Sequence, residues 1–172
     1  MFVFLKWLAF LPISILGVLA AWIVAPICPV FVDRLTWRLP RWLAWASTPH
    51  TDLRGDAAHR ERFGNRNSYL QLAWWVVRNP AVVFQRNILG VTIRLSDEFS
   101  YKGDIETRDH GKGWWFSTLR RGRRVVAFQF FCFFPYGNGK GLRLLFGWKL
   151  WEGGVTGEPC QYCNRITIWK SA

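Results

Sequence analysis

Apolar and polar residues are unevenly distributed along this chain, and its first part is almost wholly apolar. No charged residue occurs in the range Trp7–Val32. A helix needs about 20 mainly apolar residues to cross the roughly 30 Å of hydrocarbon in a bilayer, and this run is long enough. Pro26 would end or kink such a helix. The pattern predicts a transmembrane helix from about Phe4 to about Ala25, within an anchor that covers residues 1–32.

A segment rich in arginine and tryptophan follows at residues 33–46. Indole rings suit the boundary between hydrocarbon and headgroups, and guanidinium groups bind phosphate, so we expect this segment at headgroup level. Because positive flanks of membrane helices stay in the cytoplasm, the arginines predict an amino terminus outside and a cytoplasmic domain. The alternative is an amphipathic connection packed on the domain. The residues expected to contact lipid are Arg34, Arg38, Arg41, Trp37, Trp42 and Trp45.

A cleaved secretory signal is the competing interpretation of the first residues, because Lys6 precedes the apolar run. The run is longer than the apolar part of a usual signal. The residues before Cys28 also lack the small residue expected in a lipoprotein signal. An anchor that is retained is therefore favoured.

Short helices are expected in residues 47–90. Asp56 is a plausible N-cap for a helix at Ala57–Phe63. A second helix begins near residues 67–68 and stops before Pro80, which cannot continue it. Together with the part that follows, this region forms one α+β domain, residues 47–172, helical over 47–90 and β-rich over 91–172.

From Val91 onward, apolar residues alternate with polar ones, as in half-buried strands. Glycine-bearing turns bound several such runs, which predicts an antiparallel meander of about six strands, curled or partly closed. The first run starts at Val91, and the others are Tyr101–Arg108, Gly113–Leu119, Arg124–Phe134, Leu142–Trp151 and Arg165–Lys170.

Two of these strands have distinctive faces. The run Val125–Phe134 is apolar on both faces apart from Gln129, so this strand should be central, or should touch lipid or a partner. In the next strand the apolar residues share the face opposite Arg143 and Lys149. These apolar residues are Leu142, Leu144, Phe146, Trp148 and Leu150.

The charge balance narrows the class of partner. The chain has 23 Lys and Arg against 11 Asp and Glu, a formal net charge of +12, and 12 Trp. Such a surface attracts anionic lipid headgroups or nucleic acid, and the neighbouring apolar segment favours lipid. Four arginines at a turn between strands could bind lipid phosphate or a nucleic-acid backbone, and the alternative is a solvated turn. They are Arg120, Arg121, Arg123 and Arg124.

A cluster of possible metal ligands comprises His50, Asp52, Asp56 and His59. Its spacing matches no metal site with a defensible mechanism. Asp56 is better explained as a helix cap and Asp52 as a turn residue. We predict no metal site, although a catalyst working near the membrane would have to use this cluster.

The cysteine and glycine motifs give even weaker support for a metal, redox or phosphate-binding site. Cys160 and Cys163 have the spacing of half a zinc site or of a redox pair, but neither supporting context is present, so two ordinary thiols are favoured. The run Gly137–Gly141 lacks the Ser or Thr of a phosphate-binding loop and predicts a hairpin turn. With three His and no nucleophile elbow, no catalytic residue and no cofactor are predicted.

Several short motifs occur in a recognisable order between residues 47 and 150. They are Thr48-Pro49, Leu53-x-Gly55-Asp56, Trp75-x-x-Arg78-Asn79-Pro80 and Phe146-Gly147-Trp148-Lys149-Leu150. Together they resemble an uncharacterised family of small proteins encoded by tailed bacteriophages. His50 stands where an acidic residue would be expected after Thr-Pro. The resemblance implies a viral origin and a bacterial host membrane, but no reaction.

The motifs also have physical interpretations. Asn79 ends a helix, and its polar groups could form hydrogen bonds with the carbonyl groups of the last helical turn. Gly147, inside a strand, suggests close packing by a neighbouring Trp.

We therefore expect a non-enzymatic, phage-encoded protein in the host inner membrane that binds anionic lipid and a host or phage protein. The alternative is a virion or genome-associated protein whose basic surface contacts nucleic acid.

Overall fold

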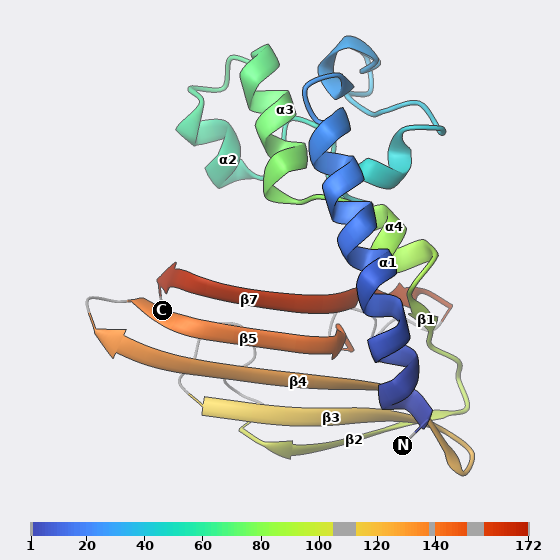
Figure 1. Ribbon diagram of the computed structural model, residues 1–172. Helices are drawn as coiled ribbons and strands as arrows, with labels where there is room; N and C mark the ends of the chain where they lie inside the picture. The colour runs from blue at the N-terminus through green and yellow to red at the C-terminus, as the bar shows by residue number, and fades with distance from the viewer. Residues whose placement is uncertain (1, 105–112, 138–139, 151–156, 172) are drawn as a thin grey trace. The chain divides into compact units, whose positions relative to one another are not determined.

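The computed structural model describes residues 2–104, 113–137, 140–150 and 157–171. Helices and one larger antiparallel sheet confirm the predicted α+β class (Figure 1). The chain folds as two compact units. The first comprises Met1–Leu11 and Leu89–Ala172, and the second comprises Pro12–Ile88.

The first helix, α1 (Phe2–Val24), is 23 residues long and contributes residues to both units. At 1.5 Å per residue it measures about 35 Å. It is long and apolar enough to cross a membrane. Signal sequences and core helices of soluble proteins can share both properties. Pro12 lies inside the helix, at the boundary between the units.

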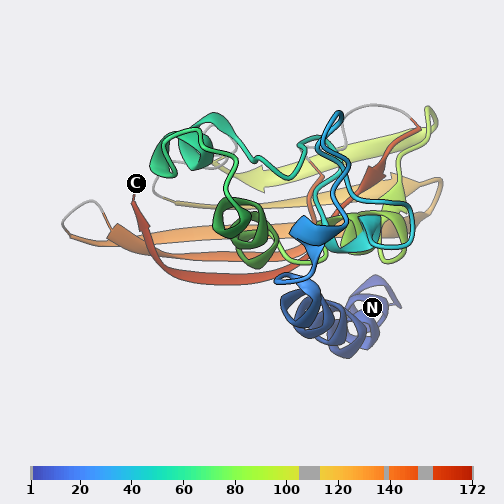
Figure 2. The same cartoon turned by 90° about the horizontal axis from the view of Figure 1, so that it is seen from above.

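A five-stranded antiparallel sheet makes up most of the first unit, in the order β2-β3-β4-β5-β7. The strands lie side by side in both views (Figures 1 and 2). Their bounds are β2 Asp97–Gly103, β3 Gly113–Arg121, β4 Arg124–Gly137, β5 Lys140–Trp148 and β7 Tyr162–Ser171. Among the described residues β2 and β7 are the edges, so the pairing is open.

The predicted meander is confirmed in its chain order but not in its number of strands. Val91–Thr92 (β1) pairs with Pro159–Cys160 (β6) in a separate two-stranded sheet. The strand that starts at Val91 ends at Thr92 because a tight turn follows it. In this turn Asp97 N donates to Arg94 O, and Arg94 N donates to the Asp97 carboxylate. The predicted strand residues 105–108 and 151 lie outside the described part of the chain.

The long strand β4 is the central one, as its two apolar faces predicted. One sheet face carries the buried residues Trp115, Phe131, Phe133, Leu145 and Cys163. Arg143 also lies on this buried face and is only 7% exposed, with its guanidinium 5.4 Å from the centre of the Phe131 ring. The other face includes Phe116, Phe128, Phe130, Phe146 and Tyr162.

The second unit contains short helices around a small apolar core. The helices are η1 (Cys28–Val30), η2 (Ala44–Ala46), α2 (Ala57–Arg62), α3 (Tyr69–Arg78) and α4 (Val82–Asn87). The predicted cap of α2 is confirmed, since the Asp56 carboxylate accepts from His59 N at 2.8 Å. Ser68 caps α3 in the same way. The core groups α1 residues such as Ala21 with Leu53, Leu72 and Val76.

Candidate functional site

The exposed side of α1 is the most unusual surface among the described residues. Most of its large apolar side chains are more than a third exposed. They are Phe2, Phe4, Leu5, Leu8, Ile13, Ile15, Leu16, Leu19, Trp22 and Ile23. Burying one such side chain is worth about 1.5–3 kcal/mol, so leaving all of them in water would forgo a large stabilisation. An apolar surface of this extent indicates contact with lipid or with another protein.

In the first unit, Trp7 holds the start of α1 against the sheet. Its indole Nε1 donates to Cys163 O at 3.0 Å, and Tyr162 Oη donates to Trp7 O at 2.9 Å. The Trp7 ring also contacts the rings of Phe128 and Phe146 edge-on, with centroids 6.0 and 5.8 Å away. Trp7 is 9% exposed. Two hydrogen bonds to β7 and aromatic packing on β4 and β5 therefore fix this part of the helix to the sheet.

In the second unit, the later part of α1 packs through small residues. Gln85 Nε2 donates to Ser14 Oγ at 3.2 Å, and both residues are buried. A Cβ on Gly17 would lie 2.9 Å from the Phe84 ring, so α4 approaches the helix closely there. Trp22 Nε1 donates to Val77 O at 3.1 Å. Residues of the second unit therefore cover one side of α1 from Pro12 onward.

The arginine and tryptophan segment forms an ordered loop. Leu35 N and Thr36 Oγ1 donate to the Asp33 carboxylate, at 2.9 and 2.8 Å. These hydrogen bonds hold the pKa of the Asp33 carboxyl below its ordinary value. Trp37 N donates to Asp33 O at 2.7 Å. Leu35 is 92% exposed beside Arg34, so the loop presents an apolar and a cationic residue at its tip.

The three tryptophans of this segment have different environments. Trp37 and Trp45 are partly buried against the core of the second unit, whereas Trp42 is 61% exposed. The Arg34 and Arg54 guanidinium groups each lie 5.5 Å from the centre of the Trp37 ring. All three predicted arginines, Arg34, Arg38 and Arg41, are exposed. The segment therefore supplies exposed cations and one exposed ring.

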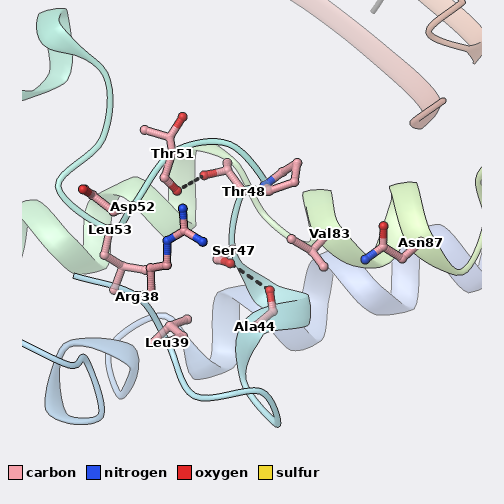
Figure 3. Close-up of a pocket in the computed structure, with 11 residues that line it drawn as sticks. Arg38, Leu39, Ala44, Ser47, Thr48, Thr51, Asp52, Leu53, Val83 and Asn87 are labelled. Carbon is pink, nitrogen blue, oxygen red and sulfur yellow. Dashed lines mark hydrogen bonds between the residues drawn. The ribbon is translucent and has the colours of Figure 1, made fainter. Parts of the chain in front are cut away.

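A polar pocket of about 300 Å³ lies in the second unit, and Figure 3 shows Arg38 directed into it. Two of its hydroxyl groups already have partners. Thr48 Oγ1 donates to Thr51 O at 2.9 Å, and Ser47 Oγ donates to Ala44 O at 2.8 Å. Arg54 pairs with Asp52, which also lines the pocket, at 2.6 Å. The described lining residues include neither His nor Cys, and they present no nucleophile paired with a base.

Asp52 illustrates the balance of effects at this pocket. Its partial burial favours the neutral acid, but hydrogen bonds from the Arg54 side chain and backbone outweigh that effect. The pKa of the Asp52 carboxyl therefore lies below its ordinary value, and the carboxylate serves as a fixed partner for Arg54.

The first three motifs of the resemblance meet around Trp75. Its indole Nε1 donates to Thr48 Oγ1 at 3.2 Å. A Cβ on Gly55 would lie 2.7 Å from the Trp75 ring, and the Arg78 guanidinium lies 5.6 Å from the centre of that ring. Asn79 N donates to Trp75 O at 3.1 Å, as expected for a residue that ends α3. These contacts give the motif residues a structural role.

Other members of these motifs complete the same cluster. Arg78 Nη1 lies 3.7 Å from Asp56 Oδ1, an exposed ion pair. Pro49 lines the polar pocket, and Pro80 follows Asn79 at the end of α3.

The fourth motif holds the first unit together. Trp148 Nε1 donates to Leu89 O at 2.8 Å, and its ring meets Phe128 edge-on. Gly147 has φ +101°, and a Cβ there would lie 2.0 Å from Phe128 O. The group that approaches the Gly147 Cβ position is therefore the backbone of β4. Lys149 N donates to Gln161 O at 2.8 Å.

The basic turn between β3 and β4 is only partly available to a ligand. Arg121 Nε and Nη2 each lie 2.8 Å from the Asp97 carboxylate, and Nη2 also donates to Thr92 O. These hydrogen bonds hold the pKa of the Asp97 carboxyl below its ordinary value. Arg120, Arg123 and Arg124 are exposed. Three of the four predicted arginines can therefore meet an anion from solvent.

The possible metal ligands are not brought together. His59 is 1% exposed, with Nε2 lying 2.9 Å from Gln71 O, and Asp56 caps α2. Asp52 pairs with Arg54, and His50 contacts Arg86 at the surface. The described residues contain no group of three or more His, Cys, Asp or Glu placed to hold a metal ion. All four cysteines are described, buried and outside any disulfide.

A second cavity, in the first unit, was not predicted from the sequence. It has a volume of about 580 Å³ and is bounded by α1 and the sheet. Its apolar side chains are spread over three strands and a helix that are distant in sequence. The only signal available was the apolar character of both faces of β4.

The comparisons with known proteins give one result. No curated protein and no solved structure matches the chain. The model of a family described as a family of unknown function, DUF7338, matches residues 1–172. The chain therefore belongs to the DUF7338 family.

Proposed function

We propose that this protein is a non-enzymatic membrane protein, held in a bilayer by α1 and bound to anionic lipid headgroups through its exposed arginines. The observation that carries the proposal is the exposed apolar side of α1. Leu16 and Ile23 are 66% and 75% exposed, and Lys6 is the only charged residue in the helix. Lipid hydrocarbon is the environment that would cover such a surface without further polar contacts.

The ordered loop after α1 supports contact with headgroups. Arg34, Arg38 and Arg41 are exposed and close in sequence to the exposed Trp42. Each Arg near an anionic membrane surface contributes about 1 kcal/mol, and a ring such as Trp42 suits the interface. The positive flank favours a cytoplasmic position for the residues that follow α1.

The packing of Trp7 bears on how α1 enters the membrane. Trp7 contacts β7, and an open sheet cannot lie in hydrocarbon because its edge N–H and C=O groups would lack partners. A complete crossing, which the sequence predicts, requires Trp7 to leave the sheet. With these contacts intact, the first part of α1 lies at the membrane boundary and offers lipid its exposed side.

The resemblance to proteins of tailed bacteriophages supports a bacterial host for the proposed membrane. The inner membrane is then the site of action, and a host or phage protein is the further partner. The motif cluster around Trp75 supports this non-enzymatic proposal, since its described contacts are structural ones.

Vesicle flotation after cell-free synthesis of the full chain tests the proposal. We expect the protein to float with phosphatidylglycerol-containing vesicles and less with phosphatidylcholine alone. Replacing Arg34, Arg38 and Arg41 with Gln removes about 3 kcal/mol of attraction, so the preference for anionic vesicles should fall about 100-fold. The matched control carries the same change at Arg62, Arg66 and Arg94, which are also exposed.

A second pair of variants tests the role of α1. Leu16→Arg with Ile23→Arg should abolish flotation, because each Arg costs about 2.5–3.5 kcal/mol in hydrocarbon. Leu70→Arg with Ile88→Arg introduces the same charges at apolar residues that are 63% and 65% exposed outside α1, and should float normally. Equal flotation of the two pairs would exclude α1 as the membrane contact.

The net charge of +12 supports nucleic-acid binding as a second candidate function. A gel-shift titration against salt separates the two. Tight binding to duplex DNA that weakens steeply with salt, together with no vesicle binding, would favour the second candidate.

A further inference from the structure

The cavity of about 580 Å³ in the first unit is an apolar groove. Its aromatic lining comes from α1 (Phe4 and Trp7), β3 (Phe116), β4 (Phe128 and Phe130) and β5 (Phe146). Its volume lies within the range of about 300–1,000 Å³ that is typical of small-molecule sites. All of these residues belong to the same unit, so the groove does not depend on the placement of the second one.

The groove offers almost no polar atom to a ligand. Apart from the indole of Trp7, Thr118 has the one polar side chain among the residues that line the groove. The Oγ1 atom of Thr118 lies 2.8 Å from Ser100 Oγ. The indole N–H of Trp7 is occupied by Cys163 O. A peptide entering the groove would leave its own backbone groups without partners, at a cost of about 1–3 kcal/mol each. A hydrocarbon chain needs no such partners.

One end of the groove carries positive charge. Val125 lines the groove and is the register partner of Arg120 across the β3–β4 ladder. Arg120, Arg123 and Arg124 are all exposed at this turn. Guanidinium groups bind phosphate through paired N–H donors, so this end suits an anionic headgroup.

We propose that the groove binds one acyl chain of an anionic membrane phospholipid, with the lipid phosphate held by the arginines of the β3–β4 turn. This inference rests on the membrane binding proposed above, in the arrangement that keeps Trp7 against the sheet, and adds a defined lipid site to it. The exposed side of α1 would contact many lipids without selection. The groove would hold a single lipid with its chain against Phe128 and Phe130.

Photocrosslinking in vesicles tests this site on the full chain. The probe is phosphatidylglycerol with a photoreactive diazirine in one acyl chain, and the labelled peptides are mapped by mass spectrometry. We expect labelling of β3 and β4 as well as α1. Thr118→Trp fills the groove and should reduce β3 and β4 labelling about tenfold. Ile166→Trp adds the same ring at a residue 61% exposed outside the groove and should leave labelling unchanged.

A charge variant tests the headgroup end. Arg120→Gln with Arg123→Gln should reduce labelling of β3 and β4 by the anionic probe, with no change for a diacylglycerol probe, which carries no phosphate. Arg62→Gln with Arg66→Gln is the matched control. Equal effects on both probes would contradict a phosphate contact at the turn.

The outcomes separate this inference from the proposed function. Labelling confined to α1 in the wild-type protein, with normal flotation, would overturn the groove site and leave membrane binding intact. Equal β3 and β4 labelling in Thr118→Trp and Ile166→Trp would also overturn it. Failure of the wild-type protein to float would overturn both.

Discussion

Gly147 gives the sharpest stability prediction, because its environment combines backbone strain with a close contact. Its φ is +101°, and an added Cβ would lie 2.0 Å from Phe128 O, whereas ordinary contact begins at 3.4 Å. The obstructing atom belongs to the backbone of β4, the central strand, so it cannot move as a side chain would. Strain of this kind costs about 1–3 kcal/mol, and overpacking adds a similar amount. We expect Gly147→Ala to lower the free energy of unfolding by about 4 kcal/mol.

Gly122 provides the matched control. It also has a positive φ, +58°, but nothing lies within 4 Å of its Cβ position. Gly122→Ala should therefore cost only about 1 kcal/mol. Chemical denaturation of both full-length variants in detergent micelles measures the difference. A Gly147→Ala variant that fails to fold beside a folded Gly122→Ala is the extreme form of the expected result. Equal stability of the two would refute the close approach of β5 to the β4 backbone.

Two further changes test single interactions. A double-mutant cycle of Trp75→Phe and Thr48→Val should give a coupling energy of about 1 kcal/mol for their hydrogen bond, and zero coupling would contradict it. Asp97→Asn should lower the free energy of unfolding by about 1 kcal/mol near neutral pH by weakening the pair with Arg121. Because the pKa of Asp97 lies below its ordinary value of 3.8, this difference persists above about pH 4 and shrinks as pH falls further. Denaturation titrations at several pH values measure this difference in unfolding free energy. A difference that grew as the pH fell would contradict the lowered pKa of Asp97.

Local signals predicted α2 and α3, but α4, η1 and η2 were not predicted. The caps at Asp56 and Ser68 act within three residues, so sequence alone is sufficient to find them. The stop before Pro80 is equally local. Apolar patterns bounded by glycine-bearing turns likewise located β3, β4 and β5, and the two apolar faces of β4 agree with its central position.

Long-range contacts could not be predicted in this way. The β1–β6 pair joins residues nearly seventy positions apart, and the hydrogen bond from Trp7 to Cys163 spans 156. Arg143 alternates with apolar residues as an exposed residue would, yet it lies on the buried face over Phe131. The apolar groove also depends on packing between distant elements, so its residues carry no common local pattern.

The candidate lipid contacts also include some that the local sequence predicts and others that depend on long-range packing. The exposed positions of Arg34, Arg38 and Arg41 follow from charge and sequence position. The burial of Trp37 and Trp45 depends instead on the small core formed by α1 and the later helices. Similarly, Arg121 is engaged by Asp97 across the sheet, which no pattern within the turn reveals.

The membrane contact of α1 can be measured residue by residue in a bilayer. Nitroxide labels at Ile13, Leu16 and Ile23 of vesicle-bound protein, and at Leu95 as an exposed reference, can be compared by their accessibility to oxygen and to a water-soluble relaxation agent. If α1 lies against lipid hydrocarbon, its three labelled positions should show high oxygen and low aqueous accessibility, with the reverse at Leu95. Free access of the aqueous agent to the α1 positions, or shielding from both agents, would contradict contact between α1 and lipid.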